Sequence, residues 1–232
     1  MGAILPHMNY SAISYGTFID RPNRFIAHVE VDGRVETVHV KNTGRCRELL
    51  VPSCRVVLEK ASNPARKTPY DLIATYKVCP GHENGWLFNI DSQAPNKVVA
   101  EWLAGQDYDL VKPEYTFGAS RVDFYMERGP ERYLLEVKGC TLEVDGVGYF
   151  PDAPTERGVK HLRELAGACE QGYHAMLAFV IQMEGVAEVR PNVATHPEFG
   201  EALAAAKAAG VEVLFLQCNV KPDSLSVHSV GH

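Results

Sequence analysis

The hydrophobic pattern of the chain changes about one third of the way along its length. Before residue 82, short segments of alternating polarity such as residues 24–31 and 35–40 are separated by turn residues, among them Asp32-Gly33. Such alternation is typical of half-buried strands joined by tight hairpins. Beyond that point, strand-like apolar segments alternate with segments of helical periodicity. The pattern predicts a small β-barrel followed by a mixed α/β domain.

The segment 81–85, which contains two glycines among polar residues, marks the predicted boundary between a domain of residues 1–82 and a domain of residues 83–232. Thr155 is the predicted N-cap of a helix in the second domain. That domain is expected to contain strands over 86–90, 175–182 and 211–217, and helices over 96–103, 155–171 and 197–209. The alternation of strands and helices implies a mixed sheet covered on both faces.

Two acidic residues are predicted to face each other across a hairpin of the second domain. The apolar segments that contain Asp123 and Glu136 flank a charged turn centred on Gly129 and Pro130. A turn centred there places Asp123 directly opposite Glu136, and like charges at such positions are destabilising. A shared divalent cation would offset that repulsion. Lys138 lies two residues past Glu136, so it projects from the same face of the strand.

Two carboxylates and one ammonium group at one point form the arrangement of a metal-dependent phosphodiester hydrolase. Mg²⁺, or Mn²⁺ in its place, binds through one or two carboxylates, several waters and substrate phosphate, so Asp123 and Glu136 are the predicted ligands. Lys138 is predicted to orient the attacking water and to stabilise the transition state. The alternative is a salt-bridged cluster of the three residues on a solvated sheet face, because charged clusters of this kind also occur without catalysis.

Length, hydropathy and cysteine usage restrict the class of protein. A chain of 232 residues, 46% of them hydrophobic, can bury a sizeable core, and it contains no apolar run of the roughly 20 residues that span a bilayer. The first residues do not resemble a signal peptide. Six scattered cysteines without a Cys-x-x-Cys pair fit reduced thiols better than a disulfide framework or a zinc site. A soluble cytoplasmic protein is therefore expected.

The charge is distributed unevenly, although the net charge of −6 argues against a uniformly DNA-coating protein. Residues 1–82 hold 11 basic and 7 acidic side chains, a balance of +4, whereas residues 83–232 hold 12 basic and 22 acidic side chains, a balance of −10. Such asymmetry suggests a nucleic-acid partner for the basic part. A small excess of this size also arises by ordinary sampling.

One predicted helix carries a polar face close to the hairpin. Arg157, Lys160, His161 and Glu164 are spaced so that they share one side of the helix. That side is a candidate for contact with a phosphate backbone, with His161 as a hydrogen-bond donor. An ordinary solvated face opposite the buried leucines is the alternative.

Several motifs along the chain are long and distinctive. They are residues 24–25 (RF), 41–45 (KNTGR), 62–67 (SNPARK), 95–96 (PN), 120–124 (SRVDF), 136–139 (EVKG), 150–165 (FPDAPTERGVKHLREL) and 210–213 (GVEV). Through these motifs the chain resembles the sugar fermentation stimulation protein A (SfsA) family of bacteria and archaea over nearly its whole length. Two departures occur: Val122 stands where the motif of the nuclease fold that this family implies has proline, and Lys41 stands where many relatives have proline before Asn-Thr-Gly-Arg.

The resemblance implies an N-terminal OB-like barrel, a C-terminal domain of the PD-(D/E)xK nuclease fold, and non-specific DNA binding with a regulatory role in sugar metabolism. In that nuclease fold the metal-binding acids and the lysine match Asp123, Glu136 and Lys138. An acid on the first core helix often joins them as a metal ligand, and Glu101 is the candidate here; a solvated helix acid is the alternative. The resemblance also favours phosphate contacts by two loops of the barrel, through Lys41, Asn42, Arg45, Arg66 and Lys67, over plain solvation of these charged loops.

These features predict a DNA-binding protein with a magnesium-dependent nuclease-like domain. The expected partner is DNA, single- or double-stranded and bound without sequence preference, and no membrane contact is expected. One alternative is a DNA-binding regulator of sugar metabolism, of the maltose type, that uses the nuclease scaffold without turnover. A weaker one is an adaptor whose acidic half contacts another protein.

Overall fold

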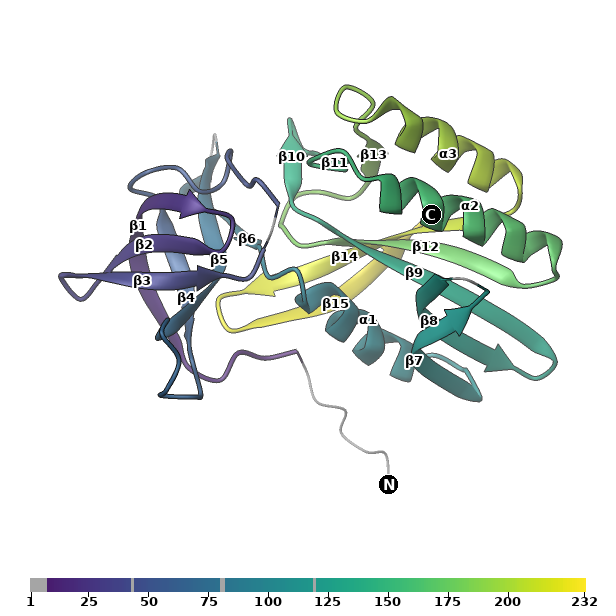
Figure 1. The fold of residues 1–232 in the computed structure, drawn as a ribbon, viewed down its shortest axis with the longest axis horizontal. Helices are drawn as coiled ribbons and strands as arrows, with labels where there is room; N and C mark the ends of the chain where they lie inside the picture. Colours follow the sequence, from purple (N-terminus) through teal and green to yellow (C-terminus); the bar gives the residue numbers. More distant parts are fainter. Residues whose placement is uncertain (1–7, 43, 80–81, 119) are drawn as a thin grey trace.

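The barrel predicted for the first part of the chain is present in a computed structural model, which describes residues 8–42, 44–79, 82–118 and 120–232 (Figure 1). Its sheet has the strand order β3-β2-β1-β4-β5-β6, and an additional parallel pairing of β3 with β5 closes it. Five strands therefore follow one another around the closed barrel in the order β1-β2-β3-β5-β4, which is the topology of an OB fold. The strands are β1 (Ile13–Asn23), β2 (Ile26–Val31), β3 (Arg34–Val40), β4 (Arg55–Lys60), β5 (Tyr70–Cys79) and β6 (His82–Asn89).

Local sequence explains the barrel's first hairpin. Asp32 and Gly33 both have positive φ, at 50° and 75°, and they join β2 to β3 with Val31 opposite Arg34. A two-residue turn with both φ values positive matches the twist of the flanking strands. Alternate side chains then fill the barrel interior: Ala27, Val29, Val31, Val38, Val40, Val56, Leu58 and Leu72, all buried.

The strand β6 extends the first sheet beyond residue 82. It pairs antiparallel with β5, from Ala74 opposite Asn89 to Cys79 opposite His82. Residue 81 of the predicted boundary segment, and residue 80 before it, lie outside the described residues. The division of the chain between residues 82 and 83 stays a prediction, and the pairing of β6 favours a position after Asn89.

A second six-stranded sheet, with strand order β15-β14-β12-β9-β8-β7, forms the centre of the remaining chain. The strands β9, β12 and β14 are mutually parallel, and antiparallel strands flank them on both sides. This is the mixed α/β sheet that the sequence predicts. The elements are α1 (Ala94–Ala104), β7 (Leu110–Phe117), β8 (Ser120–Arg128), β9 (Glu131–Cys140), α2 (Glu156–Glu170), β12 (His174–Ile181), α3 (Pro197–Ala208), β14 (Glu212–Lys221) and β15 (Ser224–Gly231).

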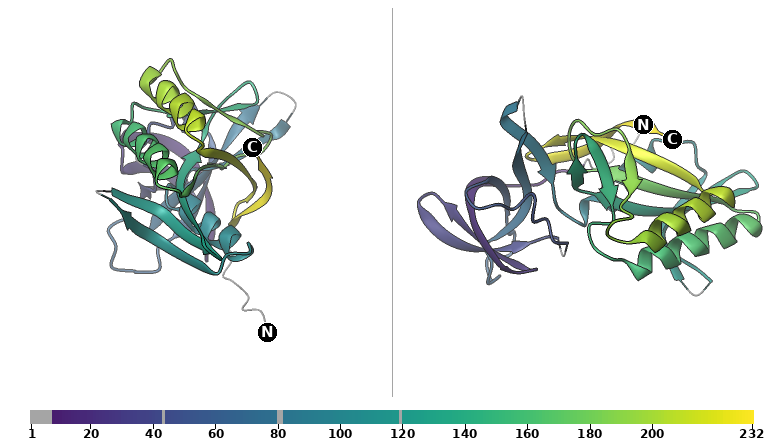
Figure 2. Two further views of the ribbon diagram at one scale, coloured as in Figure 1. Left: turned by 90° about the vertical axis from the view of Figure 1, so that its right-hand side faces the viewer. Right: turned by 90° about the horizontal axis from the view of Figure 1, so that it is seen from above.

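Helices cover both faces of this sheet. The helix α2 packs on β9 and β12 and against α3, whereas α1 contacts β9, β7 and β15 from the other side (Figures 1 and 2). Two apolar cores result, and consecutive residues of β9 divide between them: Leu134 lies in the core under α2, and Leu135 in the core over α1. A small sheet of β10 (Leu142–Val144), β11 (Val147–Phe150) and β13 (Val189–Pro191) adjoins the end of β9.

Thr155 caps α2 as predicted, since its hydroxyl accepts a hydrogen bond from the Gly158 amide at 3.0 Å. The predicted helices near residues 96–103 and 197–209 and the buried strands near 175–182 and 211–217 are also confirmed within a few residues. The small sheet and the edge strands β7 and β15 carry no clear periodicity and were not predicted. None of the helices within the described ranges has the length and hydropathy that a bilayer crossing requires.

Candidate metal site and nucleic-acid interface

The hairpin of β8 and β9 has the register that its turn predicts. Phe124 lies opposite Leu135, and the pairing continues without a shift to Arg128 opposite Glu131. Beyond Phe124 the ladder ends and the strands diverge. The Asp123 carboxylate fills that gap, where it accepts a hydrogen bond from the Val137 amide at 2.7 Å.

Asp123 is held from two elements. Besides the main chain of β9, the side-chain amide of Asn96 at the start of α1 donates to its other carboxylate oxygen at 2.8 Å. Asn96 was not among the predicted site residues, although it follows Pro95 within one of the motifs of the sequence. These two bonds orient the carboxylate with no rotamer freedom left to it, which is the condition for a precise ligand geometry.

Glu136 lies on the face of β9 that α2 covers, and only 3% of it is exposed. Its Oε1 atom is in close contact with both the Lys138 ammonium and the His161 imidazole. Lys138 reaches Glu136 because two residues along a strand restore the same face. The remaining ring nitrogen of His161 accepts a hydrogen bond from Nε of Arg157 at 3.2 Å, which leaves Nδ1 to donate to Glu136.

The two acids have opposite electrostatic surroundings. Burial raises the pKa of Asp123, and the nearby charge of Glu136 raises it further, against the opposing effects of the Val137 amide, Asn96 and Lys138. Burial also favours a higher pKa for Glu136, but the His161 hydrogen bond and the Lys138 charge outweigh it and lower the pKa. Carboxyl groups with pKa values moved apart in this way are frequent at functional sites.

The donor set fits a hard divalent cation better than a structural transition metal. Among the described residues, no three or more histidine, cysteine, aspartate or glutamate side chains form a group that could hold a metal ion. A closed zinc site needs such a group, whereas magnesium binds through one or two carboxylates and completes its shell with water and phosphate. Asp123 is repelled by the charge of Glu136, and a bound cation would reduce that repulsion.

Glu101 does not join the pair. Its carboxylate accepts a hydrogen bond from the main-chain amide of Met8 at 2.8 Å, so it is directed toward the N-terminal segment. It follows Asn96 by five positions on α1, which turns it about 140° away around the helix axis. The structure therefore gives no support to the metal-ligand role that the resemblance implies for Glu101.

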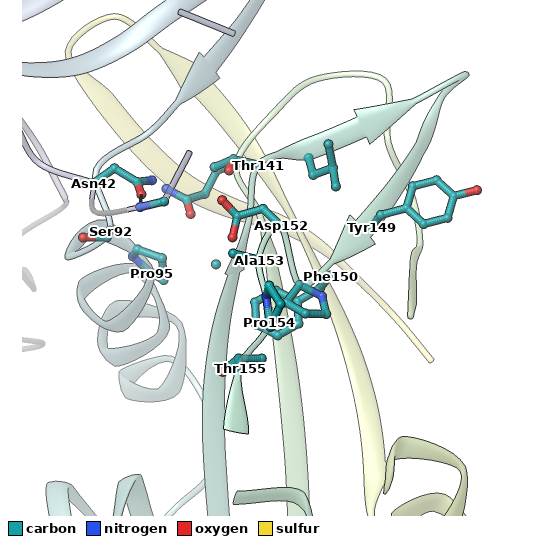
Figure 3. A pocket seen from close by; sticks show the side chains of 15 residues that line it. Asn42, Ser92, Pro95, Thr141, Tyr149, Phe150, Asp152, Ala153, Pro154 and Thr155 are labelled. Atoms are coloured by element: carbon teal, nitrogen blue, oxygen red, sulfur yellow. Dashed lines mark hydrogen bonds between the residues drawn. The ribbon is translucent and has the colours of Figure 1, made fainter. Parts of the chain in front are cut away.

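A pocket of about 320 Å³ is lined by residues of the barrel and of the α/β domain (Figure 3). Pro95, which precedes Asn96, and Gly139, which follows Lys138, line this pocket, whereas Asp123 and Glu136 are not among its lining residues. A side chain at Gly139 would collide with Gln182 and Pro95, because an added Cβ would lie 2.4 and 2.8 Å from their side-chain atoms. The remaining lining comes from Asn42, Gly44, Ser92, Thr141, Leu142, Gln182 and the loop 149–155.

Three of the predicted nucleic-acid ligands are engaged inside the protein. Lys41 lies 3.0 Å from the buried Asp91 carboxylate, and Arg66 makes a two-pronged contact with Asp71 at 2.9 and 2.7 Å. The Asn42 side-chain amide donates to the Ile90 carbonyl at 2.8 Å. These contacts hold the barrel and its loops together, so the predicted phosphate-binding role of these side chains has no support in the structure.

The other predicted ligands differ in their exposure. Arg45 and Lys67 are exposed on the barrel, whereas Thr43, between Asn42 and Gly44, lies outside the described residues. On α2, Lys160 is exposed and lies 3.6 Å from Glu164. His161 is buried against Glu136, so it supports the acid rather than reaching a ligand as a donor.

Two arginines at the end of β1 and in the β1–β2 turn were missed by the sequence analysis. Arg21 and Arg24 lie beside Arg45 and Arg47 around a second hollow of about 320 Å³ at the end of the barrel. Arg24 and Arg47 stand within or beside motifs of the sequence, but their proximity depends on the barrel closing. Only a fold-level prediction of which loops meet could have found them.

Comparison with known proteins agrees with the architecture. A family model described as the sugar fermentation stimulation protein RE domain matches residues 93–224, and one described as the SfsA N-terminal OB domain matches residues 19–86. The chain belongs to the SfsA family. A sugar fermentation stimulation protein homolog of Desulfitobacterium hafniense is 52% identical over 221 residues, covering 94% of each chain. A homolog of Clostridium beijerinckii is 50% identical over 224 residues, covering 95% of this chain and 96% of the relative.

A solved SfsA structure has the same fold. The SfsA of Pyrococcus furiosus, whose structure was determined in complex with Ca²⁺, matches with a TM-score of 0.83 at 25% sequence identity, over 97% of each chain. The OB-like barrel and the following α/β domain are thus features that this chain shares with the family.

Proposed function

We propose that this SfsA protein binds DNA and hydrolyses phosphodiester bonds with a divalent cation, Mg²⁺ or Mn²⁺, at Asp123 and Glu136. The observation that carries the proposal is the divergence of β8 and β9 at Asp123, which brings a carboxylate with a raised pKa beside Glu136 and Lys138. A cation bound by the two carboxylates supplies polarisation of the scissile phosphate and a more acidic coordinated water.

Different side chains of the site have different roles: some orient the two carboxylates, and Lys138 stabilises charge. Asn96 and the Val137 amide hold Asp123, and His161 holds Glu136, so both carboxylates are kept in place by neighbouring groups. The Lys138 ammonium is a mobile positive charge on a flexible stem. It can turn from Glu136 to the phosphate oxygens, where it stabilises charge that develops as the bond breaks.

Two findings from relatives support the proposal. The Pyrococcus furiosus SfsA was solved with Ca²⁺, which like Mg²⁺ is a hard cation with a preference for carboxylate oxygens. The family model for the second part of the chain is described as an RE domain. Calcium commonly takes the place of magnesium at carboxylate sites, so the metal of that relative fits the donor set found here.

A DNA partner without sequence preference fits the distribution of charge. Exposed arginine and lysine side chains at the barrel can contact phosphates, which position a nucleic acid but do not read its sequence. Such a partner places the protein in the cytoplasm. Five cysteines are free thiols, which fits a reducing compartment: Cys46, Cys54, Cys140, Cys169 and Cys218.

A regulator of sugar metabolism without turnover is the second candidate, and one observation favours it. Glu136 already has two cationic or donating partners within the chain, Lys138 and His161, so this carboxylate is satisfied without a metal. The relatives are named for sugar fermentation stimulation. In that case the nuclease-like domain serves as a DNA-binding platform.

Incubation of the pure protein with single- and double-stranded DNA and Mg²⁺ or Mn²⁺ separates the two candidates. Asp123→Asn and Lys138→Met should each reduce cleavage by about 10²–10³-fold while DNA binding persists. Glu131→Gln is the matched control, because it removes an exposed acid at the other end of β9. Calorimetry should show divalent-cation binding that Asp123→Asn abolishes. DNA binding by the wild-type chain without any cleavage over a wide range of Mg²⁺ and Mn²⁺ concentrations would instead support the regulator.

A further inference from the structure

The hollow at the end of the barrel is lined by four arginines in a chain of net negative charge. Arg21 lies near the end of β1 and Arg24 in the β1–β2 turn, and Arg45 and Arg47 come from the segment after β3. The remaining lining residues are Asn23, Gly44, Cys46 and Leu50. A concave surface rimmed by guanidinium groups is suited to phosphate oxygens, with which arginine forms paired hydrogen bonds.

Arg21 holds the segments that line this hollow together by hydrogen bonds to their main chain. Its Nη1 atom donates to the carbonyls of Gly44 and Arg45, both at 2.9 Å. Its Nη2 atom donates to the carbonyls of Arg24 at 2.8 Å and Asn42 at 2.6 Å. The Arg21 guanidinium therefore joins the β1–β2 turn to the segment after β3. It also binds four carbonyl oxygens whose partial negative charge would otherwise repel an anion.

The other three arginines are available to a ligand. Arg24, Arg45 and Arg47 are exposed, and among the described residues none of them forms an ion pair with a carboxylate. Lys41 and Arg66, in contrast, are neutralised by Asp91 and Asp71. Guanidinium groups without internal partners retain their full charge for an incoming anion.

An exposed aromatic ring indicates what the anion belongs to. Phe25 is 51% exposed, and the Arg24 guanidinium lies 5.9 Å from its ring centroid. A phosphate site with an adjacent open aromatic face matches a nucleotide unit, because unpaired bases stack on aromatic side chains while basic groups hold the backbone. A paired base inside a duplex cannot offer its face in this way.

We propose that the arginine hollow, formed by Arg21, Arg24, Arg45 and Arg47, binds a phosphate group of single-stranded DNA, with Phe25 stacking on a neighbouring base. The inference rests on the DNA binding of the proposed function and narrows it to an unpaired strand. Gly44 lines both this hollow and the pocket of Figure 3. A strand held at the hollow can therefore extend toward that pocket, which Pro95 and Gly139 line as the chain neighbours of Asn96 and Lys138.

Fluorescence anisotropy in EDTA tests the proposal without any contribution from catalysis. The probes are an internally labelled single strand with a 5′-hydroxyl, the same strand with a 5′-phosphate, and the matching duplex. Arg24→Gln, Arg45→Gln and Arg47→Gln should each weaken single-strand binding and reduce the slope of log K against log salt by about 0.7. Phe25→Ala should weaken binding of the single strand roughly 5- to 100-fold and leave the duplex unchanged.

Arg34→Gln is the matched control. Arg34 is also an exposed arginine of the barrel, but it follows the far end of β2, about 20 Å from the turn that holds Arg24. It should leave affinity for the single strand unchanged apart from a small general salt effect. Circular dichroism is expected to show the same fold for all variants, since each altered side chain is exposed.

The strand with a 5′-phosphate distinguishes a terminal phosphate from an internal phosphodiester. Tighter binding of the 5′-phosphorylated strand assigns the hollow to a terminal phosphate, and equal binding assigns it to an internal phosphodiester. If the three hollow variants bind like Arg34→Gln, if Phe25→Ala affects the duplex equally, or if the wild-type chain binds no single strand, the inference is overturned. A chain that binds through the hollow but never cleaves would refute only the catalytic part of the proposed function.

Discussion

Replacement of Lys41 by methionine should destabilise the protein without weakening its hold on DNA. The Lys41 ammonium lies 3.0 Å from Asp91 and 3.5 Å from Glu59, and its side chain is only 14% exposed. Burial by itself would lower the pKa of Lys41, but the attraction of Asp91 outweighs that effect and the pKa is raised. A lysine with a raised pKa stabilises the fold throughout the pH range below its usual titration, and this stabilisation is lost only as the pH rises through the folded value.

The magnitude follows from the burial of Asp91, whose side chain is 0% exposed. Removal of one partner from a buried ion pair costs about 3–5 kcal/mol, because the remaining charge has no counterpart. Asp91 keeps hydrogen bonds from Tyr10 at 3.2 Å and from the Gln93 amide at 2.9 Å, so we expect the lower end of that range. For a chain of this length, about 3 kcal/mol corresponds to a fall in Tm of roughly 6–12 °C.

Scanning calorimetry at neutral pH measures this shift, and anisotropy with labelled DNA measures affinity in parallel. The double variant Lys41→Met with Asp91→Asn should recover part of the lost Tm, because a neutral amide needs no cation while it keeps the hydrogen bonds. A Lys41→Met protein with an unchanged Tm and a weakened affinity for DNA would refute the reasoning. Lys41 would then be the phosphate ligand that its loop suggests in the sequence.

Two further predictions concern the site itself. Because Asp123 has a raised pKa, its ionised form destabilises the metal-free fold, and this penalty disappears as the pH falls through the raised pKa. The Tm of the wild-type chain should therefore rise relative to that of Asp123→Asn as the pH is lowered. A relative fall of the wild-type Tm in acid would contradict the assignment. Gly139→Ala should lower the free energy of unfolding by about 1–3 kcal/mol, because the new Cβ would lie 2.4 Å from the Gln182 amide oxygen. Gly167→Ala, in α2 with nothing within 4 Å, should instead raise it by up to about 1 kcal/mol. Equal shifts in Tm for both variants would show that the contact at Gly139 is not tight.

The parts of the fold that the sequence predicts correctly depend on short-range rules. A two-residue turn at Asp32-Gly33 fixes the first hairpin, and the charged turn before Glu131 fixes the register of β8 and β9. Both follow from turn chemistry and the two-residue period of strands. The same period places Glu136 and Lys138 on one face of β9, as expected.

The predictions that found no support depend on partners far away in the chain. Glu101 bonds to the segment at Met8, and Lys41 pairs with Asp91. Local periodicity and composition do not predict either contact, because each joins segments that are far apart in the sequence and meet only in the folded chain. A formal charge count has the same weakness, because it treats the neutralised Arg66 and the free Arg24 alike.

Polar contacts between the barrel and the α/β domain hold these two parts of the chain together. Lys77 of β5 lies 2.6 Å from Glu143 of β10, where burial would raise the pKa of Glu143 but the lysine contact lowers it. The Gln182 amide donates to the Asn89 side chain at 3.0 Å across the same junction.

A third contact closes this junction at the loop between the two hollows. The Asp152 carboxylate, from the loop before α2, accepts the main-chain amide of Arg45 at 3.2 Å. The Gln182–Asn89 bond is buried and the Lys77–Glu143 contact is half-buried, whereas the Asp152–Arg45 bond is exposed. Buried contacts hold the two parts together better than exposed ion pairs do. We therefore expect the arginine hollow to keep a constant distance from Asp123 and Glu136. A strand bound at the hollow would reach the acids at a constant number of nucleotides, so any cleavage of a 5′-phosphorylated single strand that binds by its end should give products of one dominant length. A broad ladder of products from that substrate would show that the strand slides past the hollow instead of being anchored there.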